Sequence, residues 1–357
     1  LIGTDGVLLR QDGAGPILTI TESDCQLSKI SFSSTRERQI CVQITDSKQV
    51  LVSECQCDGG GVPHSAIFVE RSQQITIRSC TATGSSNGIA LVSSHGEVIG
   101  NRCHDNAQGG ILFASSTGRA EANECWGNAL GIAIQCDSRT PEHPSDVTLV
   151  GNHCQDNDGA GIVFSASTGQ ADQNECWGNQ GNGILIRCFP ESPGHPSHVT
   201  LQSNRCHANA GAGIRFLAST GLVEQNECWD NTEEGIRVHC APEKPDYPSH
   251  VTIRGNRCHE NATGIIFICS TGLAEQNECW SNKHAGIRVQ SVPEALAHPS
   301  HVTLRGNRCH ANAGRGIIFS ASTGRAEQNE CWGNQANEIS TAGGSEVIVY
   351  DHRTSPS

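Results

Sequence analysis

Five tryptophans constrain this chain more than any other feature, because each one follows a cysteine in the same Asn-Glu-Cys-Trp motif. They are the only tryptophans in the sequence, at Trp126, Trp177, Trp229, Trp280 and Trp332. The steps between them are 51, 52, 51 and 52 residues. Self-similarity at a fixed period is the signature of a repeat protein, so we expect an array of one unit and not an irregular globular core.

A second motif falls midway between the tryptophans, which divides each unit into two turns. It reads Asn-Arg-Cys at residues 101–103, 204–206, 256–258 and 307–309, and Asn-His-Cys at 152–154. The step is 22 residues from Cys103 to Cys125 and 29 from Cys125 to Cys154. Helical repeats need about 33 residues or more, and helices tolerate glycine poorly. The pattern therefore favours a coil of short strands.

In such a coil, equivalent residues of successive turns stack about 4.8 Å apart and form ladders of like side chains. Stacked asparagine amides hydrogen-bond to the turns above and below. The predicted asparagine ladder is Asn101, Asn123, Asn152, Asn174, Asn204, Asn226, Asn256, Asn277, Asn307 and Asn329.

The cysteines two places after these asparagines are expected to point inward as small apolar side chains. At least twelve of the 19 cysteines fit this position, with Cys55 and Cys80 extending the register toward the amino end and Cys331 closing it. In-register neighbours lie farther apart than the Cβ separation of a disulfide. We expect mostly free, buried thiols, which a reducing compartment maintains, so the sequence favours the cytoplasm. A periplasmic or secreted protein is the alternative, because we expect the amino end to be truncated. A soft-metal stripe is the alternative, although a line of ligands does not converge on one ion.

One stretch carries a family resemblance. Residues 302–334, VTLRGNRCHANAGRGIIFSASTGRAEQNECWGN, resemble the right-handed parallel β-helix repeats of the pectate-lyase-like superfamily, of the NosD type or carbohydrate-binding-and-sugar-hydrolysis (CASH) type. The resemblance covers roughly residues 50–340 and implies an all-β, single-stranded right-handed parallel β-helix, a solenoid of about 14 turns. The superfamily holds lyases, hydrolases, epimerases, phage tailspikes, a copper-centre accessory protein and intracellular interaction modules, so the fold does not choose a function.

Domain organisation follows from the repeat. We expect one β-helix domain over residues 1–357, with degenerate turns at 1–80, regular paired turns at 81–340 and a cap or tail at 341–357. The chain contains no methionine and begins inside a strand-like stretch, so we expect a fragment with flanking domains in the full-length protein. A net charge of −13 argues against nucleic acid as a partner, and no apolar run is long enough to span a membrane.

Two outward rows are predicted to flank the cysteines. The residues before each cysteine alternate in charge and are interpreted as a solvated charge ladder. The residues after each cysteine form a stripe that is either a platform for sugars or a peptide, or a set of rings that fill the corners between turns. This stripe is His104, Trp126, Gln155, Trp177, His207, Trp229, His259, Trp280, His310 and Trp332.

The long turns predict a ridge of exposed, proline-rich excursions. They read CDSRTPEHPSD, CFPESPGHPSH, CAPEKPDYPSH and SVPEALAHPSH. One row would hold His143, His195, Tyr247 and His298, and the next Asp146, His198, His250 and His301. Paired imidazoles suit metal or acid–base chemistry, whereas the alternative is that these histidines cap strands or pack on proline.

No non-repeated cluster of Asp, Arg or Lys stands out between residues 95 and 335, and no nucleophile motif or phosphate-binding loop does either. The leading hypothesis is therefore a non-catalytic interaction or scaffold module that needs no cofactor. It would bind an extended protein or glycan along the stripe and the ridge. The alternatives are a carbohydrate-active enzyme or glycan-binding protein of the superfamily, and a NosD-like metal-handling protein.

Overall fold

The computed structural model describes residues 8–10, 15–33, 39–61, 64–136, 143–188, 197–240, 248–292, 299–350 and 352–354. Within these ranges every regular element is a β-strand. The chain divides into two compact units, Leu1–Glu175 and Cys176–Ser357, so that the boundary falls inside one short strand. The single domain expected over residues 1–357 stays a prediction.

Each turn of the coil contributes one strand to each of three sheets. The cysteine sheet takes its name from the central residue of most of its strands. In the first unit it contains β1 (Leu8–Leu9), β4 (Ser31–Ser33), β7 (Gln56–Gly61), β10 (Thr81–Ser85), β13 (Arg102–His104), β16 (Glu124–Trp126) and β19 (His153–Gln155). In the second it contains β22 (Glu175–Trp177), β25 (Arg205–His207), β28 (Glu227–Trp229), β31 (Arg257–His259), β34 (Glu278–Trp280), β37 (Arg308–His310) and β40 (Glu330–Trp332).

The phenylalanine sheet carries a buried phenylalanine in many of its strands. Its first-unit strands are β2 (Leu18–Thr21), β5 (Val42–Thr45), β8 (Ile67–Glu70), β11 (Asn87–Val92), β14 (Gly109–Ala114), β17 (Leu130–Gln135) and β20 (Ile162–Ser165). Its second-unit strands are β23 (Ile184–Arg187), β26 (Ile214–Leu217), β29 (Ile236–His239), β32 (Thr263–Ile268), β35 (Ala285–Gln290), β38 (Arg315–Ser320) and β41 (Ile339–Ala342).

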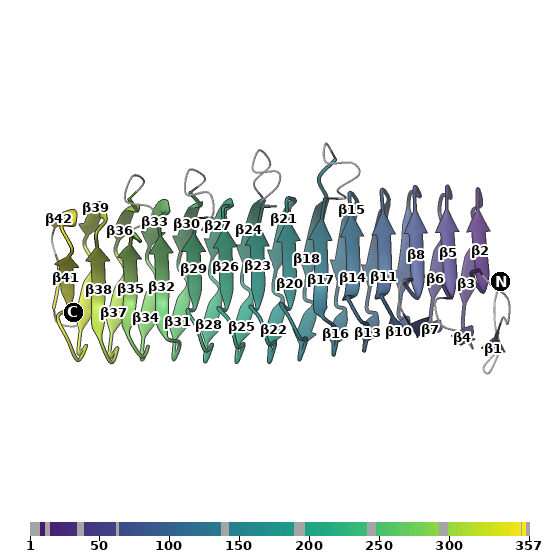
Figure 1. Ribbon diagram of the computed structural model, residues 1–357, viewed down its shortest axis with the longest axis horizontal. Helices are drawn as coiled ribbons and strands as arrows, with labels where there is room; N and C mark the ends of the chain where they lie inside the picture. The colour runs from purple at the N-terminus through teal and green to yellow at the C-terminus, as the bar shows by residue number, and fades with distance from the viewer. Residues whose placement is uncertain are drawn as a thin grey trace. The chain divides into compact units, whose positions relative to one another are not determined.

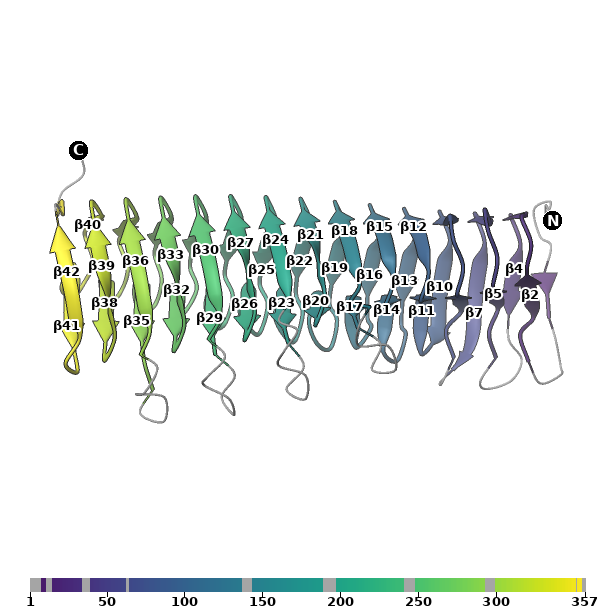
Figure 2. The same cartoon turned by 90° about the horizontal axis from the view of Figure 1, so that it is seen from above.

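The threonine sheet completes each turn. In the first unit it contains β3 (Gln26–Ser28), β6 (Leu51–Ser53), β9 (Ile75–Arg78), β12 (His95–Ile99), β15 (Thr117–Glu121), β18 (Asp146–Val150) and β21 (Thr168–Asp172). In the second it contains β24 (His198–Gln202), β27 (Thr220–Glu224), β30 (His250–Arg254), β33 (Thr271–Glu275), β36 (His301–Arg305), β39 (Thr323–Glu327) and β42 (Glu346–Tyr350). Figure 2 shows β24 to β42 side by side.

Within each unit, strands pair in parallel with the strand three places on in the chain, as β28 pairs with β31 and β29 with β32. The three sheets therefore coil as seven turns in each unit, fourteen in all (Figure 1). The predicted all-β parallel β-helix of about 14 turns is confirmed. Its two-turn period is confirmed as well, because Trp229 pairs with His259 and Glu227 with Arg257.

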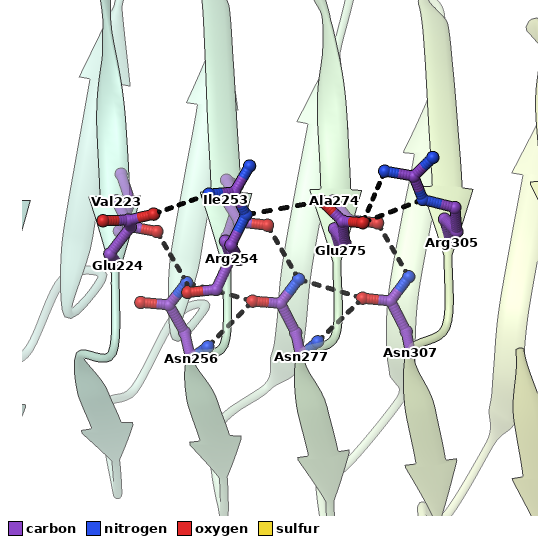
Figure 3. Close-up of polar contacts among 10 residues, drawn as sticks. All are labelled: Val223, Glu224, Ile253, Arg254, Asn256, Ala274, Glu275, Asn277, Arg305 and Asn307. Carbon is purple, nitrogen blue, oxygen red and sulfur yellow. Dashed lines mark hydrogen bonds and ion pairs between the residues drawn. The ribbon is translucent and has the colours of Figure 1, made fainter.

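The predicted asparagine ladder lies at the corner between the threonine and cysteine sheets, and it is buried. Asn277 Nδ2 donates to the Ile253 carbonyl at 3.0 Å and to Asn307 Oδ1 at 2.9 Å. Asn277 Oδ1 accepts from the backbone and side-chain nitrogens of Asn256, at 2.9 and 3.0 Å (Figure 3). Each amide thus satisfies backbone groups that a tight buried corner otherwise leaves unpaired.

The other two corners carry ladders of their own. Between the cysteine and phenylalanine sheets a second asparagine ladder repeats the same geometry, as when Asn261 Nδ2 donates to the Cys228 carbonyl at 2.9 Å. Between the phenylalanine and threonine sheets the ladder is made of serine. There Ser300 Oγ accepts from the Ser270 backbone N–H at 3.2 Å and donates to the Gln290 carbonyl at 2.7 Å. All three corners are therefore closed by short polar side chains.

The inward cysteine ladder is confirmed, with one correction at its amino end. Cys57, not Cys55, pairs with the inward position of the next turn, which is occupied by Ala82 and not by Cys80. Cys55 and Cys80 stand two residues earlier, at the asparagine corner, where each thiol donates to the carbonyl two residues before it at 3.3 Å. A strand has a period of two, so a shift of two residues keeps a side chain buried and hides the change of role.

All nineteen cysteines lie in the described ranges, and none is disulfide-bonded. Every one is buried except Cys25, which is half-buried. Burial raises the pKa of the Cys258 and Cys279 thiols well above the ordinary range, because a thiolate is poorly solvated inside the coil. These two thiols are therefore protonated and inert.

The short turns carry a glycine where the chain passes close to the backbone of the preceding turn and to a phenylalanine ring. Gly272 follows Ser-Thr, and a Cβ at this position would clash with the Val251 carbonyl oxygen of the preceding turn and lie 3.0 Å from Cε1 of Phe267 in its own turn. Its φ of +156° is also a backbone conformation that side chains disfavour. Gly324 and Phe319 repeat the arrangement two turns later. The Ser-Thr-Gly motif is thus a packing requirement of the core.

Candidate functional site

The Trp/His stripe is a continuous stack of rings in the second unit. From Trp177 through His207, Trp229, His259, Trp280 and His310 to Trp332, successive ring centroids lie alternately about 6 and about 4.2–4.5 Å apart, all nearly parallel. In the first unit His104 stacks on Trp126 at 4.4 Å. The sequence prediction of a ring-bearing row is therefore borne out in its geometry.

This geometry limits what the stripe can bind. The ring faces look along the coil toward the next ring, and the half-buried side chains leave mainly their edges outside. Arg205 and Arg257 add cations 5.1 Å from the Trp229 and Trp280 ring centroids. Sugar recognition by stacking needs a free aromatic face, which the interior rings of the stack do not offer. The stripe as a partner-binding surface stays a prediction.

The charge row beside the cysteines alternates as predicted. Glu227 and Arg257 are register partners whose Oε1 and Nη1 atoms lie 3.0 Å apart, and Arg308 Nε lies 3.1 Å from Glu330 Oε2. A second alternating row runs along the threonine sheet, where Arg254 bridges Glu224 at 3.0 Å and Glu275 at 3.3 Å (Figure 3). These exposed rows compensate their own charge turn by turn.

The histidines that open the threonine-sheet strands pair with threonine and not with one another. His198, His250 and His301 each lie 2.8 Å, Nδ1 to Oγ1, from the threonine of the following turn: Thr220, Thr271 and Thr323. Exposed His143 lies at the end of the first excursion, beside Ser94 and Thr117. His195, Tyr247 and His298 lie outside the described residues.

The stripe and the described ends of the excursions lie at different corners of the coil. The described excursion ends, such as Cys136 and Ser145, lie at the serine corner, between the phenylalanine and threonine sheets. The stripe residues end the cysteine-sheet strands from β13 to β40, next to the second asparagine corner. Across the described ranges no three His, Cys, Asp or Glu side chains converge in a way that would hold a metal ion.

The outer face of the phenylalanine sheet breaks the repeat. In the second unit its outward positions hold Arg215 in β26, Arg237 in β29 and Arg288 in β35, separated by Ile266 in β32. Arg215 and Arg237 are register partners on adjacent turns, about 4.8 Å apart along the coil. Two like charges therefore face outward side by side, unlike the alternating rows on the other two sheets.

Among the described residues, the Nε atoms of these arginines are also unsatisfied. The Nε atoms of Arg215, Arg237 and Arg288 are buried and have no hydrogen-bond partner there. Glu233 and Glu234 lie near two of the arginines: they are 3.5 and 3.4 Å from Arg237 Nη1, and they also act on Arg215. Burial and then the neighbouring Arg237 guanidinium lower the pKa of Arg215. An unsatisfied buried N–H costs about 1–3 kcal/mol, so this face is held at the expense of stability.

His239 joins the same cluster. It lies on the outer side of β29, between Leu217 and Ile268 in the neighbouring turns. Burial, Arg237 and Arg215 together lower its pKa to about 4, so the ring is neutral at physiological pH.

A shallow basic hollow continues the face toward the carboxyl end of the second unit. It has a volume of about 320 Å³, and its lining includes Lys283, His284, Arg288, Arg315 and Ile318. Lys283 and Arg315 are exposed, and the described residues of the lining include no carboxylate. We name Arg215, Arg237, His239, Lys283, Arg288 and Arg315, with the half-buried Leu217 and Ile318, the arginine face. Ile266 and Ile268, in the same sheet, are buried.

Comparison with known proteins places the chain in a family. Residues 40–190 and 192–353 match the family described as the right-handed β-helix region. The chain belongs to the right-handed β-helix family. The match is to the family as a whole, so a NosD-type subgroup stays a prediction. No curated protein sequence matches the chain.

Solved structures of other right-handed β-helix proteins resemble it at low identity. The periplasmic alginate epimerase AlgG has a TM-score of 0.57 at 14% identity, covering 90% of this chain and 77% of that one. A point mutant of the same epimerase gives 0.59 at 13%, covering 91% and 77%. The Streptococcus pneumoniae surface protein and adhesin PfbA gives 0.49 at 12%, covering 92% and 91%. At such identities the likeness establishes the fold alone.

The arginine face corrects the expectation that no cluster interrupts this β-helix between residues 95 and 335. Its signal is present in the sequence: the Gly-Ile pair that opens the phenylalanine-sheet strands is followed by arginine at Arg215, Arg237 and Arg288, and by Leu, Ala, Val or Ile in other turns. Because these arginines are 22 and 51 residues apart, they become a cluster only when the turns are stacked. In the described part of the chain, no helix is long and apolar enough to cross a membrane.

Proposed function

We propose that this β-helix is a non-catalytic interaction module that binds an extended partner, protein or glycan, along its turns. The observation that carries the proposal is the arginine face, a run of under-compensated cations over four steps of the coil in a chain of net charge −13. A surface that concentrates positive charge on an otherwise negative protein attracts negatively charged partners.

The described residues support binding more than catalysis. The carboxylates and histidines of the outer rows are repeated and paired, as Arg254 is with Glu224 and His250 with Thr271. A reaction needs a singular constellation of acid, base or nucleophile around one reacting atom. An extended surface of like turns instead suits an extended ligand. The Trp/His stripe remains a predicted partner contact through its ring edges. The excursion ridge, whose described ends lie at the serine corner, remains a predicted partner contact as well.

A glycan-acting protein is the second candidate. The same cations would suit the carboxylates of an acidic polysaccharide, and one structural neighbour is named an alginate epimerase. For the cellular compartment we propose the cytoplasm, on the ground that eighteen buried thiols are most easily kept reduced there.

Two polymers test the proposal. The chain is incubated with poly-glutamate and with alginate, amide hydrogen exchange of the protein is followed, and the polymers are recovered and analysed by NMR for cleavage, elimination or epimerisation. We expect slower exchange in strands of the second unit with at least one polymer, and both polymers recovered unchanged. Conversion of either polymer contradicts a non-catalytic role, and unchanged exchange with both contradicts a binding role for an acidic partner.

A further inference from the structure

The arginine face lies on a single side of the second unit and spans consecutive turns. From Arg215 in β26 to Arg315 in β38 there are four steps of the coil, about 19 Å at 4.8 Å a step. An extended peptide rises about 3.3 Å a residue, so about six residues cover this distance. The face therefore matches a short linear segment.

Chemistry distinguishes among acidic ligands. The cations are flanked by half-buried aliphatic side chains: Leu217 lies beside His239, and Ile318 beside Arg288. Outward positions of β26, β29, β32, β35 and β38 carry no tryptophan, tyrosine or phenylalanine. Sugars are bound largely on aromatic faces, whereas aliphatic patches between cations suit a peptide with alternating acidic and aliphatic side chains.

We infer that the arginine face is a docking site for an extended acidic segment of a protein, in which carboxylates pair with Arg215, Arg237, Arg288 and Arg315 and aliphatic side chains lie on Leu217 and Ile318. This inference rests on the proposed function and adds the chemistry of the partner. Peptide carboxylates pair from outside the sheet with the half-buried guanidinium groups of Arg215, Arg237 and Arg288. They also offset the repulsion between Arg215 and Arg237.

The test uses a fluorescein-labelled eight-residue peptide of alternating glutamate and valine, with the alternating glutamine and valine peptide as its neutral control. Fluorescence anisotropy measures binding to the whole chain. We expect the acidic peptide to bind at least tenfold more tightly than the neutral one, and its affinity to fall as salt is raised.

Matched variants locate the site. Arg237→Gln with Arg288→Gln removes two cations of the face, and Arg254→Gln with Arg305→Gln removes two from the threonine sheet of the same two turns. We expect at least tenfold weaker binding for the first pair and less than twofold for the second. Circular dichroism checks the fold. Should the first pair fail to fold, Arg315→Glu, at an exposed position in the hollow, is expected to weaken binding about tenfold by itself.

Three outcomes overturn the inference: equal weakening by both pairs, no weakening by the first, or tighter binding of an oligoglucuronate of the same charge than of the peptide. The last result reassigns the face to acidic glycans. None of these outcomes requires polymer turnover, so each leaves the non-catalytic role standing, whereas turnover in the polymer experiment removes that role whatever the peptide does.

Discussion

The cysteine sheet and the phenylalanine sheet of the second unit present opposite kinds of outer surface. On the cysteine sheet, cation follows anion and ring follows ring, so Arg257 has Glu227 beside it and Trp229 has His207 and His259. On the phenylalanine sheet, Arg215 has Arg237 beside it, and three guanidinium Nε atoms lack partners among the described residues. Repeated side chains that pair with one another stabilise the fold. Side chains that interrupt the repeat and lower stability indicate a surface that is retained for a ligand.

The largest effect is expected where the ladders are buried. Asn277→Ala removes the acceptor for two Asn256 nitrogens and the donor to the Ile253 carbonyl. Leaving these buried groups unpaired should cost about 3–5 kcal/mol in the free energy of unfolding, measured in urea. Asn277→Cys is the matched control, because Cys80 closes the same corner with its thiol. A loss as large with cysteine as with alanine would contradict the proposed role of the corner thiols.

The Trp/His stack comes next. Trp229→Ala removes a half-buried indole that lies between His207 at 4.2 Å and His259 at 6.1 Å, and we expect a loss of about 2–3 kcal/mol. Trp332→Ala, with His310 stacked at 4.5 Å in the last turns, should cost about half as much. Urea unfolding measures both. If Trp229→Ala instead leaves the stability unchanged and abolishes polymer binding, the stripe is a contact surface for the partner.

Sequence predicted the coil well because ladder positions recur at fixed steps. The roles of Asn277 and Trp229 can be predicted from spacing alone, since the asparagine recurs in each regular turn and the tryptophan in every second one. The position of Cys55 in the ladder could not be predicted from the sequence, because a two-residue shift along a strand keeps the side chain buried. The arginine face was missed for another reason: Arg215, Arg237 and Arg288 are far apart in the chain, and only the parallel pairing of β26 to β35 brings them together. Repeated residues predict the scaffold from the sequence, whereas residues that depart from the repeat can be grouped only once the strand register is known.

Acid provides a more local test of the arginine face. The pKa of His239 is lowered to about 4, against about 6.5 for an unperturbed histidine. Between these values the unfolded chain takes up a proton that the folded chain does not, so the stability associated with the neutral ring is lost as pH falls through this window. We expect about 1–2 kcal/mol less stability at the lower end, with the partly exposed ring limiting the effect.

The matched control for this acid effect is His239→Leu, since Leu217 occupies the same row one turn earlier. Urea unfolding across the window should show a shallower loss in the variant, because Glu233 and the other titrating groups are common to both proteins. An identical pH dependence in the two proteins would mean that the histidine is as accessible to protons in the folded state as in the unfolded state.

The smallest expected effect is a change in stability that has opposite signs for an arginine of the arginine face and an arginine of a paired charge row. Arg215→Leu removes a buried, unpaired Nε and a like-charge neighbour, and leucine already holds this row at Leu185 in the preceding turn, so we expect about 0.5–1 kcal/mol of added stability. Arg254→Leu breaks ion pairs with Glu224 and Glu275 and should lose about 0.5 kcal/mol. Thermal unfolding of both variants measures the difference. If the substitution stabilises the fold and weakens binding of the acidic peptide, the arginine is retained for binding. If Arg215→Leu destabilises as Arg254→Leu does, Arg215 belongs to the structural ladders, and the contrast between the two sheets disappears.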